Sequence, residues 1–275
     1  MGQARFGQQG HHLRCRTGYA RSCCGSRCLP HCRHPAENAR AAHNGGPDPA
    51  SPESHPGGHR IVTIEIKVLT LGVASTNAYI VGDTDTQLAV VIDPVDNADL
   101  LLQTADEAGW QIKAIMATHG HYDHVLACGA LKQQTGAPFA IHEATPQIAG
   151  TADDYIEQLF PPIPQPDQLL TDKSTTIEIG NIRLETLFTP GHAPDHVCFF
   201  MREQQILFGG DCLFQSSVGR SDLPFGDHET LMQSIFDVIM PLGDSVHVLP
   251  GHMQPTTIGR ERTTNPFLLH HLRSR

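Results

Sequence analysis

The hydrophobic patterning of this chain changes abruptly near residue 62, and that change constrains its fold more than any other feature. Over residues 62–68 apolar side chains occupy every second position, which is typical of a half-buried strand, and strand and helix signals then alternate along the rest of the chain. The first 60 residues show neither periodicity. They carry eight arginines, no lysine and three acidic residues, whereas the remainder carries 11 basic and 26 acidic side chains. We therefore expect one folded domain over residues 62–275.

The first 61 residues are predicted to be a disordered extension, or sequence translated upstream of a true start at Val62. This segment has few aliphatic residues, so it cannot bury enough apolar surface to offset the entropy of ordering. Its cysteines and histidines lack the second well-spaced CxxC pair of a zinc site, and the segment is not amphipathic like a transit peptide. It also lacks the apolar core of a secretory signal. We therefore expect a cytoplasmic protein.

Charge and hydropathy exclude two classes of partner. The net charge of −10 argues against a general nucleic-acid-binding protein, which needs a basic face. The sequence contains no run of 18 apolar residues, so no membrane-spanning helix is predicted. We expect no nucleic acid and no membrane among the partners of this chain.

Strand and helix signals in both halves of the domain predict two β-sheets packed face to face, with helices outside them. The expected strands cover residues 62–68, 77–81, 88–92, 112–117, 139–142, 176–179, 182–187, 197–201, 205–208 and 246–249. The expected helices cover residues 97–110, 124–134, a stretch through 156–159, 229–239 and a short segment after 267.

Four potential metal ligands lie within six residues, directly after the buried strand at 112–117. They are His119, His121, Asp123 and His124. A loop at a strand end is exposed while the sheet holds it in place, as a preformed site requires. Imidazole and carboxylate together suit zinc, iron, manganese or cobalt, and the absence of thiolate argues against copper(I) or an iron–sulfur cluster. This density of ligands argues against the alternative, a solvated histidine-rich turn.

Three further potential ligands each follow a later strand. His192, Asp211 and His252 come directly after the strands at 182–187, 205–208 and 246–249, and each has a glycine beside it. A glycine permits the backbone to approach a metal or substrate closely. Each residue alone fits an ordinary cap or turn equally well. Together with the ligand loop, they predict one shared metal site.

These motifs resemble the metallo-β-lactamase superfamily, over residues 62 to 275. The resemblance implies an α/β fold, the four-layer αββα sandwich, with two divalent metal ions at one edge. Zinc is the expected metal, with iron or manganese as alternatives. The implied ligands are His119, His121 and His192 for one ion, Asp123, His124 and His252 for the other, and Asp211 as the bridge between them.

Within the superfamily, several segments are similar to the glyoxalase II group, the hydroxyacylglutathione hydrolases. The segments are Asn77-Ala78-Tyr79, Thr189-Pro190-Gly191-His192, Gly209-Gly210-Asp211-Cys212-Leu213-Phe214 and, closer to the short bacterial branch, Gly219-Arg220-Ser221-Asp222. The long enzymes of the group add a C-terminal helical domain with glutathione contacts. This chain has only 23 residues after His252. The thioester chemistry is therefore expected to carry over more directly than the glutathione specificity.

The resemblance implies a metal-dependent thioester hydrolase that acts on S-lactoylglutathione or a related acyl-glutathione. A hydroxide held by the two metal ions would be the nucleophile. Asp123 and Asp211 are the expected catalytic residues. The residues expected to contact substrate are Tyr122, in the ligand loop, and Arg220, Arg260 and Arg262, which could pair with substrate carboxylates. For each arginine the alternative is a solvated surface charge.

Three other functions stay open on the sequence. A lactonase would use the same dinuclear site on a cyclic ester. A persulfide dioxygenase would use a single iron ion, which seven ligands disfavour, and a metal-binding protein with a vestigial site is disfavoured by the intact ligand set. The nucleases of the superfamily carry a large inserted domain for which this chain has no room. Asp93 and His196 are expected either to support the ligands or to be ordinary turn and strand residues.

Overall fold

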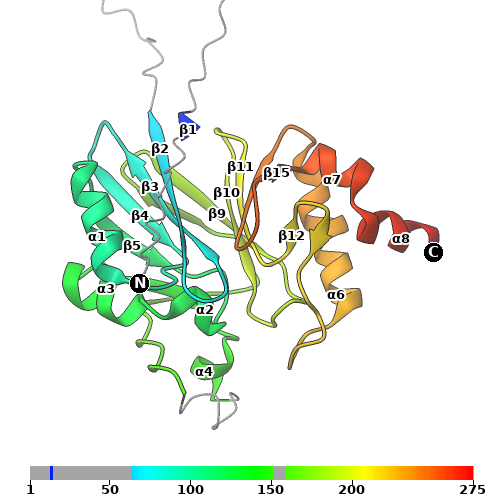
Figure 1. Ribbon diagram of the computed structural model, residues 1–275, viewed down its shortest axis with the longest axis horizontal. Coiled ribbons are helices and arrows are strands. Elements are labelled where there is room, and N and C mark those ends of the chain that lie inside the picture. Colours follow the sequence, from blue (N-terminus) through cyan, green and yellow to red (C-terminus); the bar gives the residue numbers. More distant parts are fainter. Residues whose placement is uncertain (1–12, 15–62, 151–158, 275) are drawn as a thin grey trace, which may run out of the picture. The chain divides into compact units, whose positions relative to one another are not determined.

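The computed structural model describes Leu13–Arg14 and residues 63–150 and 159–274 (Figure 1). The expectation of a disordered extension over residues 1–61 lies outside the described residues, apart from Leu13–Arg14. These two residues form the short strand β1, in which Leu13 pairs with Ile66 in an antiparallel register. None of the described helices is long and apolar enough to cross a membrane.

The first sheet contains seven strands in sequence order from β1 to β7. Its remaining strands are β2 (Ile64–Leu71), β3 (Thr76–Asp83), β4 (Leu88–Ile92), β5 (Gln111–Met116), β6 (Phe139–His142) and β7 (Gln168–Leu170). Strands β2 to β4 are antiparallel, whereas β4 to β7 run parallel. Helices α1 (Ala98–Glu107) and α3 (Cys128–Thr135) pack against β5. Asn97 caps α1 by accepting a hydrogen bond from the Leu100 N–H.

The second sheet contains six strands in the order β15-β14-β11-β10-β9-β8. They are β8 (Thr176–Ile179), β9 (Ile182–Phe188), β10 (Val197–Met201), β11 (Ile206–Gly210), β14 (His247–Pro250) and β15 (Thr256–Thr257). Its outer elements are α6 (His228–Gln233), the π-helix η1 (Ser234–Ile239), the 3₁₀ turn η2 (Met240–Leu242), α7 (Ile258–Thr264) and α8 (Pro266–Ser274). A hairpin of β12 (Leu213–Phe214) and β13 (Ser217–Val218) follows β11.

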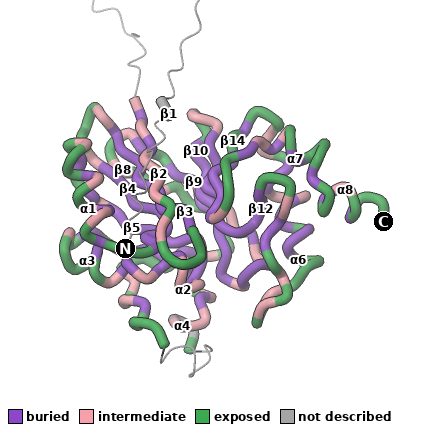
Figure 2. Tube along the Cα trace, viewed as in Figure 1, coloured by how far each residue is buried: buried purple, intermediate pink, exposed green. Residues whose placement is uncertain are grey.

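Side-chain alternation along the strands explains why the sheets are layered. In β3, Ala78 and Ile80 pack with the core under α1 and α3, whereas Tyr79 and Val81 face the second sheet. In β10 the odd-numbered residues enter the core between the sheets and the even-numbered residues pack under α6 and η1. Because successive side chains point to opposite faces of a strand, each sheet is buried on both sides. The burial map shows these strands as the purple interior of the molecule (Figure 2). The predicted four-layer αββα sandwich is confirmed.

Two predicted helices differ from the structure. The helix expected over residues 124–134 is divided into α2 (Tyr122–Val125) and α3, because the Ala127 N–H donates to the Pro94 carbonyl instead of continuing the helical ladder. Of the helical stretch expected before residue 159, the structure describes α4 (Pro146–Ala149), and residues 151–158 lie outside the described part. The short strands β7, β12, β13 and β15 were not predicted.

Candidate metal centre

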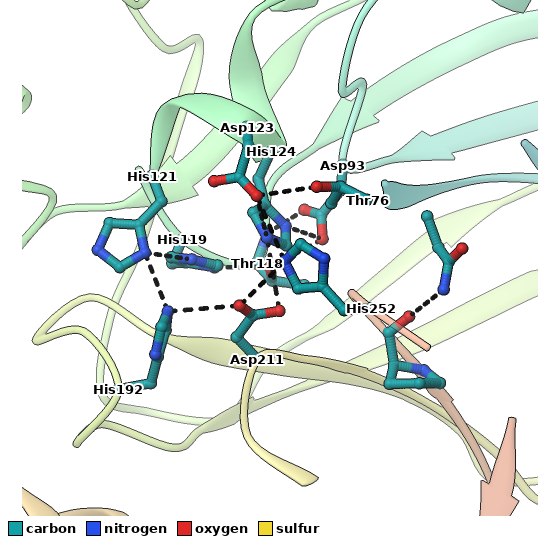
Figure 3. A network of polar contacts seen from close by, with 12 residues as sticks. Thr76, Asp93, Thr118, His119, His121, Asp123, His124, His192, Asp211 and His252 are labelled. Carbon is teal, nitrogen blue, oxygen red and sulfur yellow. Dashed lines mark hydrogen bonds and ion pairs between the residues drawn. The ribbon is translucent and has the colours of Figure 1, made fainter. Parts of the chain in front are cut away.

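The seven predicted ligands lie together where strands of both sheets end (Figure 3). His119 follows β5, and His121 immediately precedes α2, which carries Asp123 and His124. The other three ligands lie on loops that follow strands of the second sheet: His192 follows β9, Asp211 follows β11 and His252 follows β14. The sheets therefore bring residues 119 and 252 of the chain to one edge of the sandwich, as the strand-end pattern predicted.

Three imidazoles form the first group of ligands. The Nδ1 atom of His121 lies 2.9 Å from Nε2 of His119 and 2.9 Å from Nε2 of His192. Within this group the candidate ligand atoms all lie within 4.8 Å of one another. The three rings come from two loops of different sheets, and Figure 3 shows them converging on one point.

Asp123, His124 and His252 form the second group. His252 Nε2 lies 3.3 Å from Asp123 Oδ2, and His124 Nε2 lies 3.6 Å from the same oxygen. The ligand atoms of this group also lie within 4.8 Å of one another. It combines two imidazoles with one carboxylate, the donor set that suits a borderline divalent ion.

Asp211 lies between the two groups. Its Oδ2 atom is 3.6 Å from His192 Nε2 in the first group and 3.3 Å from His252 Nε2 in the second. Its Oδ1 atom is 3.5 Å from His124 Nε2. The carboxylate therefore reaches both groups with its two oxygens, the position expected of a bridging ligand.

Hydrogen bonds on the far sides of the rings determine which ring nitrogens are free. His192 Nδ1–H donates to the Arg220 carbonyl oxygen at 2.7 Å, and His124 Nδ1–H donates to Asp93 Oδ2 at 2.9 Å. The Nε2 atoms of both rings therefore carry lone pairs in the neutral form. Histidines that bind metals are held in this way, with the second nitrogen bonded to a carbonyl or carboxylate.

The arrangement fits a pair of metal ions better than it fits an ordinary hydrogen-bond network. His124 Nε2 and Asp211 Oδ1 are buried without a hydrogen-bond partner among the described residues. Burial and the nearby His192 lower the pKa of His121 to about 4, so this imidazole is neutral and able to bind a metal at pH 7. Lone pairs that face one another in a buried site repel, and a bound cation removes that repulsion. The two groups and Asp211 therefore fit a dinuclear metal site.

Asp93 and Thr118 support the ligand loop from beneath. Besides His124, the Asp93 carboxylate accepts hydrogen bonds from the Thr118 N–H at 2.7 Å and the Thr118 hydroxyl at 2.9 Å. Because that hydroxyl donates to Asp93, it accepts from His119 Nδ1–H at 3.0 Å. One buried carboxylate thus orients a ligand in each group. Of the two roles left open for Asp93, the supporting one matches these contacts.

Two further residues hold the carboxylate ligands. His196 accepts a hydrogen bond from the Asp211 N–H at 3.0 Å, and burial lowers the pKa of His196 to about 3, which keeps that nitrogen unprotonated. Thr76 donates from its hydroxyl to Asp123 Oδ2 at 2.8 Å. Sequence reasoning missed Thr76, because a threonine at the start of a strand carries no local sign of a partner 47 residues away.

Glycines beside the ligands are required by close contacts. A Cβ atom at Gly251 would lie 2.3 Å from Asp211 Oδ1, and one at Gly120 would lie 2.4 Å from the Thr145 side chain. Real Cβ contacts are never this short, so either substitution would displace the ligand loops. Gly251, beside His252, is one of the glycines for which the sequence predicted a close approach, and its contact is with the ligand Asp211.

The residues predicted to contact substrate lie in different places. Tyr122 stacks on Phe160 with ring centroids 4.3 Å apart and lines a cavity of about 260 Å³ that also includes His121. Arg220 pairs with Asp222 at 2.9 Å on the surface, and Arg262 pairs with Asp244 at 2.7 Å. Arg260 forms an ion pair with the neighbouring buried Glu261. No arginine is among the described residues that line the cavity beside His121, so these three substrate contacts stay predictions.

Comparisons with known proteins agree with this geometry. Over 218 residues the chain is 34% identical to the hydroxyacylglutathione hydrolase GloC of Haemophilus influenzae, covering 74% of this chain and 98% of that protein. The crystal structure of the BLEG-1 B3 metallo-β-lactamase matches with a TM-score of 0.65 and 35% identity, covering 74% of this chain and 99% of that one. The crystal structure of TTHA1623 in a di-iron-bound form matches with a TM-score of 0.64 and 34% identity, covering 73% and 99%. The model of the metallo-β-lactamase superfamily matches residues 71–252. The chain therefore belongs to the metallo-β-lactamase superfamily.

Proposed function

We propose that this protein is a metal-dependent thioester hydrolase that acts on an acyl-glutathione such as S-lactoylglutathione. The observation that carries the proposal is the complete set of seven ligands, in two groups that share Asp211. The similarity to GloC, which covers 98% of that protein, supports the choice of substrate. The resident metal is proposed to be zinc, with iron as the alternative that the di-iron form of TTHA1623 raises.

Two bound divalent ions would supply hydroxide at neutral pH and polarise the carbonyl of the substrate. The protein side chains perform the remaining tasks. Burial would raise the pKa of Asp123, but the contacts of its Oδ2 atom with His252 and Thr76 outweigh burial and hold the pKa below its ordinary value, so this carboxylate stays ionised and would help to hold the second metal ion. Asp211 fixes the separation of the two ligand groups, because its oxygens contact histidines of both. Asp123 and Asp211 are therefore the proposed catalytic residues.

The cavity beside His121 is the proposed place of the substrate. Its walls are mainly apolar and include Tyr122, which would exclude water from the thioester. Arg220, Arg260 and Arg262 are proposed to bind the glutathione carboxylates. Arg220 is exposed and its pairing with Asp222 is solvated, so exchanging that partner for a substrate carboxylate costs little. The small-molecule thioester is the only partner proposed, and the proposed location is the cytoplasm.

A substrate panel on purified, metal-loaded protein tests the proposal. The panel contains S-lactoylglutathione, a homoserine lactone and a chromogenic β-lactam, and oxygen uptake is followed with a persulfide. We expect the thioester to have the highest kcat/KM and elemental analysis to find about two metal ions per chain. Faster hydrolysis of the lactone or β-lactam would contradict the substrate assignment and leave the metal site intact. Oxygen consumption with a single iron ion per chain would contradict the assignment as a hydrolase and indicate a dioxygenase.

A further inference from the structure

The hairpin of β12 and β13 connects two parts of the candidate metal centre. It begins at Leu213, two residues after the ligand Asp211, and ends at Val218, two residues before Arg220. The Arg220 carbonyl accepts the hydrogen bond from His192 Nδ1–H at 2.7 Å. The Phe214 ring also lies edge-on to the ring of His252, with ring centroids 6.1 Å apart. The hairpin therefore adjoins ligands of both groups.

The tip of this hairpin is short and its backbone is strained. Gln215 and Ser216 alone connect the paired residues Phe214 and Ser217. Ser216 has a φ of 58°, in the left-handed region that a residue with a Cβ atom rarely adopts. A two-stranded hairpin of this length is at best marginally stable by itself. Its shape therefore depends on contacts made from outside the hairpin.

Two side chains at the end of α7 provide such contacts, and we call them the hairpin clamp. Glu261 is 0% exposed, and its Oε2 atom accepts a hydrogen bond from the Ser216 N–H at 2.7 Å. Asn265 Nδ2 donates to the Ser217 carbonyl at 2.9 Å and to the same Glu261 oxygen at 2.9 Å. Glu261 and Asn265 thus hold two successive backbone groups at the tip of the hairpin.

The other oxygen of Glu261 is fixed as well. Oε1 accepts from the Thr256 hydroxyl at 2.5 Å and forms an ion pair with Arg260. Every one of these partners is a donor, so the carboxylate is held in one orientation. Replacing a buried ion pair by apolar side chains of similar volume is often neutral or stabilising, so packing alone does not require a carboxylate here. Its contacts with the hairpin give it another role.

We propose that Glu261 and Asn265 are positioning residues of the metal centre and act on it through the hairpin. By holding Ser216 and Ser217 in place, they hold the chain that continues to Arg220. The Arg220 carbonyl then stays within reach of His192 Nδ1–H and keeps the His192 ring in one orientation. The inference concerns the metal ligands alone, so it does not depend on which substrate the protein hydrolyses.

Two variants open the clamp in different ways. Glu261→Met keeps much of the volume of the side chain and removes both acceptors. Asn265→Ser is milder, because serine can still accept from the Phe267 N–H at the start of α8 but has no donor for the Ser217 carbonyl. Asp83→Asn is the matched control. Asp83 is also a buried carboxylate that accepts from a backbone N–H, that of Asn181 at 2.9 Å, and it lies in β3, away from the hairpin.

Two measurements on the zinc-loaded protein test the proposal. The first is the exchange of the His192 Nδ1–H proton with water, followed by NMR. In Glu261→Met we expect this exchange to be at least about tenfold faster, because local opening of the hairpin becomes easier. The second is the affinity for zinc, measured by competition with a chelator. We expect it to fall about tenfold in Glu261→Met and about threefold in Asn265→Ser, since a direct supporting partner is worth about 10- to 100-fold.

Asp83→Asn should unfold at lower denaturant concentration than the wild type and leave both measurements unchanged. Wild-type proton exchange and zinc affinity in the two clamp variants would overturn the proposal and leave the network a purely structural one. An equal loss of zinc affinity in Asp83→Asn would also overturn it, because the loss would then follow stability. If Glu261→Met does not fold, the comparison of Asn265→Ser with Asp83→Asn decides. Neither measurement uses a thioester, so failure of the proposed function is seen separately.

Discussion

The ligand loop and the three strand-end residues come to the same candidate metal centre by different means. His119, His121, Asp123 and His124 lie in one segment that follows β5 of the first sheet, so a local turn and the short helix α2 bring them together. His192, Asp211 and His252 come from three loops of the second sheet and meet the others only when the two sheets pack together. One half of the centre is therefore determined by local structure and the other half by tertiary structure.

The supports of the two halves cross between the sheets. Asp93 and Thr76 hold the ligand loop from the first sheet, and Asp195, which follows β9 of the second sheet, accepts from the Gly120 N–H of the same loop. The loop that carries His252 is tied to the first sheet. Tyr79 donates its hydroxyl to the Pro250 carbonyl at 2.6 Å, and Asn77 Nδ2 donates to the same carbonyl at 3.0 Å. The comparison shows that β3 positions ligands of both halves.

The largest effect is expected at Asp211, because this residue contacts histidines of both ligand groups. Asp211→Asn replaces one of the two carboxylate oxygens that contact histidines of both groups. Loss of a mere supporting partner typically costs 10- to 100-fold in metal affinity or activity, so loss of this shared ligand should lower kcat/KM by at least about a hundredfold. Elemental analysis should find fewer than two ions per chain. Retention of both ions and full activity would contradict the bridging position.

Asp93→Ala should weaken the locally formed half more than the other. The change removes the acceptor for His124 and for the Thr118 hydroxyl. Since that hydroxyl in turn accepts from His119, two histidines of the ligand loop lose the contacts that orient them. We expect a loss of about 10- to 100-fold in metal affinity or activity, measured by titration of the metal-free protein. Asp99→Ala, on the exposed start of α1, is the control and should change neither. Equal metal affinity and equal activity in the two variants would show that Asp93 does not support the ligands.

Thr76→Val should have a smaller effect. The valine keeps the shape of the side chain and removes the hydroxyl that donates to Asp123 Oδ2. One charge-assisted hydrogen bond is worth about 1.5–3 kcal/mol, and Asp123 keeps its contact with His252, so we expect about a tenfold fall in kcat/KM. Thr76→Ser should retain most of the activity because it retains the donor. A full loss in Thr76→Ser would indicate that packing, and not the hydroxyl, matters here.

A substitution at Asp83, at the end of β3 away from the metal ligands, should lower stability and leave turnover unchanged. Asp83 accepts hydrogen bonds at 2.9 Å from both the N–H and the side chain of Asn181, between β8 and β9, and so links the two sheets away from the metal centre. Burial would raise the pKa of Asp83, but its hydrogen bonds with Thr86 and Asn181 outweigh burial and lower the pKa below its ordinary value of 3.8.

Asp83→Ala should therefore lower the free energy of unfolding by about 1–3 kcal/mol at pH 7, with kcat unchanged. Because the folded-state pKa is depressed, this stabilisation is present above the ordinary pKa and is lost as the pH falls through the folded-state value. The difference between wild type and variant in denaturant unfolding should shrink as the pH is lowered below 3.8. A constant difference across that range would contradict the ionic contribution.

The local half of the centre was predictable from the sequence, whereas its surroundings were not. His119 to His124 lie within six residues after a buried strand, so spacing alone indicated a site. His192, Asp211 and His252 needed the additional assumption that strand ends share one edge. Thr76 could not be found in this way, because its partner lies 47 residues away and the contact arises from packing of separate elements.

The fold shows the same division. The continuous apolar runs of β4 and β10 and the alternating residues of β8 gave strand bounds that the structure reproduces. The break between α2 and α3 was missed, because it depends on the contact of Ala127 with the carbonyl of Pro94. The short strands β12 and β15 were missed as well, since two residues carry no periodicity.

The contact between His121 and His192 has a consequence for the unfolded chain. The two residues are 71 positions apart, and their ring nitrogens lie 2.9 Å from each other. An ion bound to both would close a long covalent loop through the backbone, as a disulfide does in secreted proteins, and would reduce the number of conformations open to the denatured chain. In a protein whose described cysteines are all free and buried, the catalytic metals would thus also serve as its reversible cross-link.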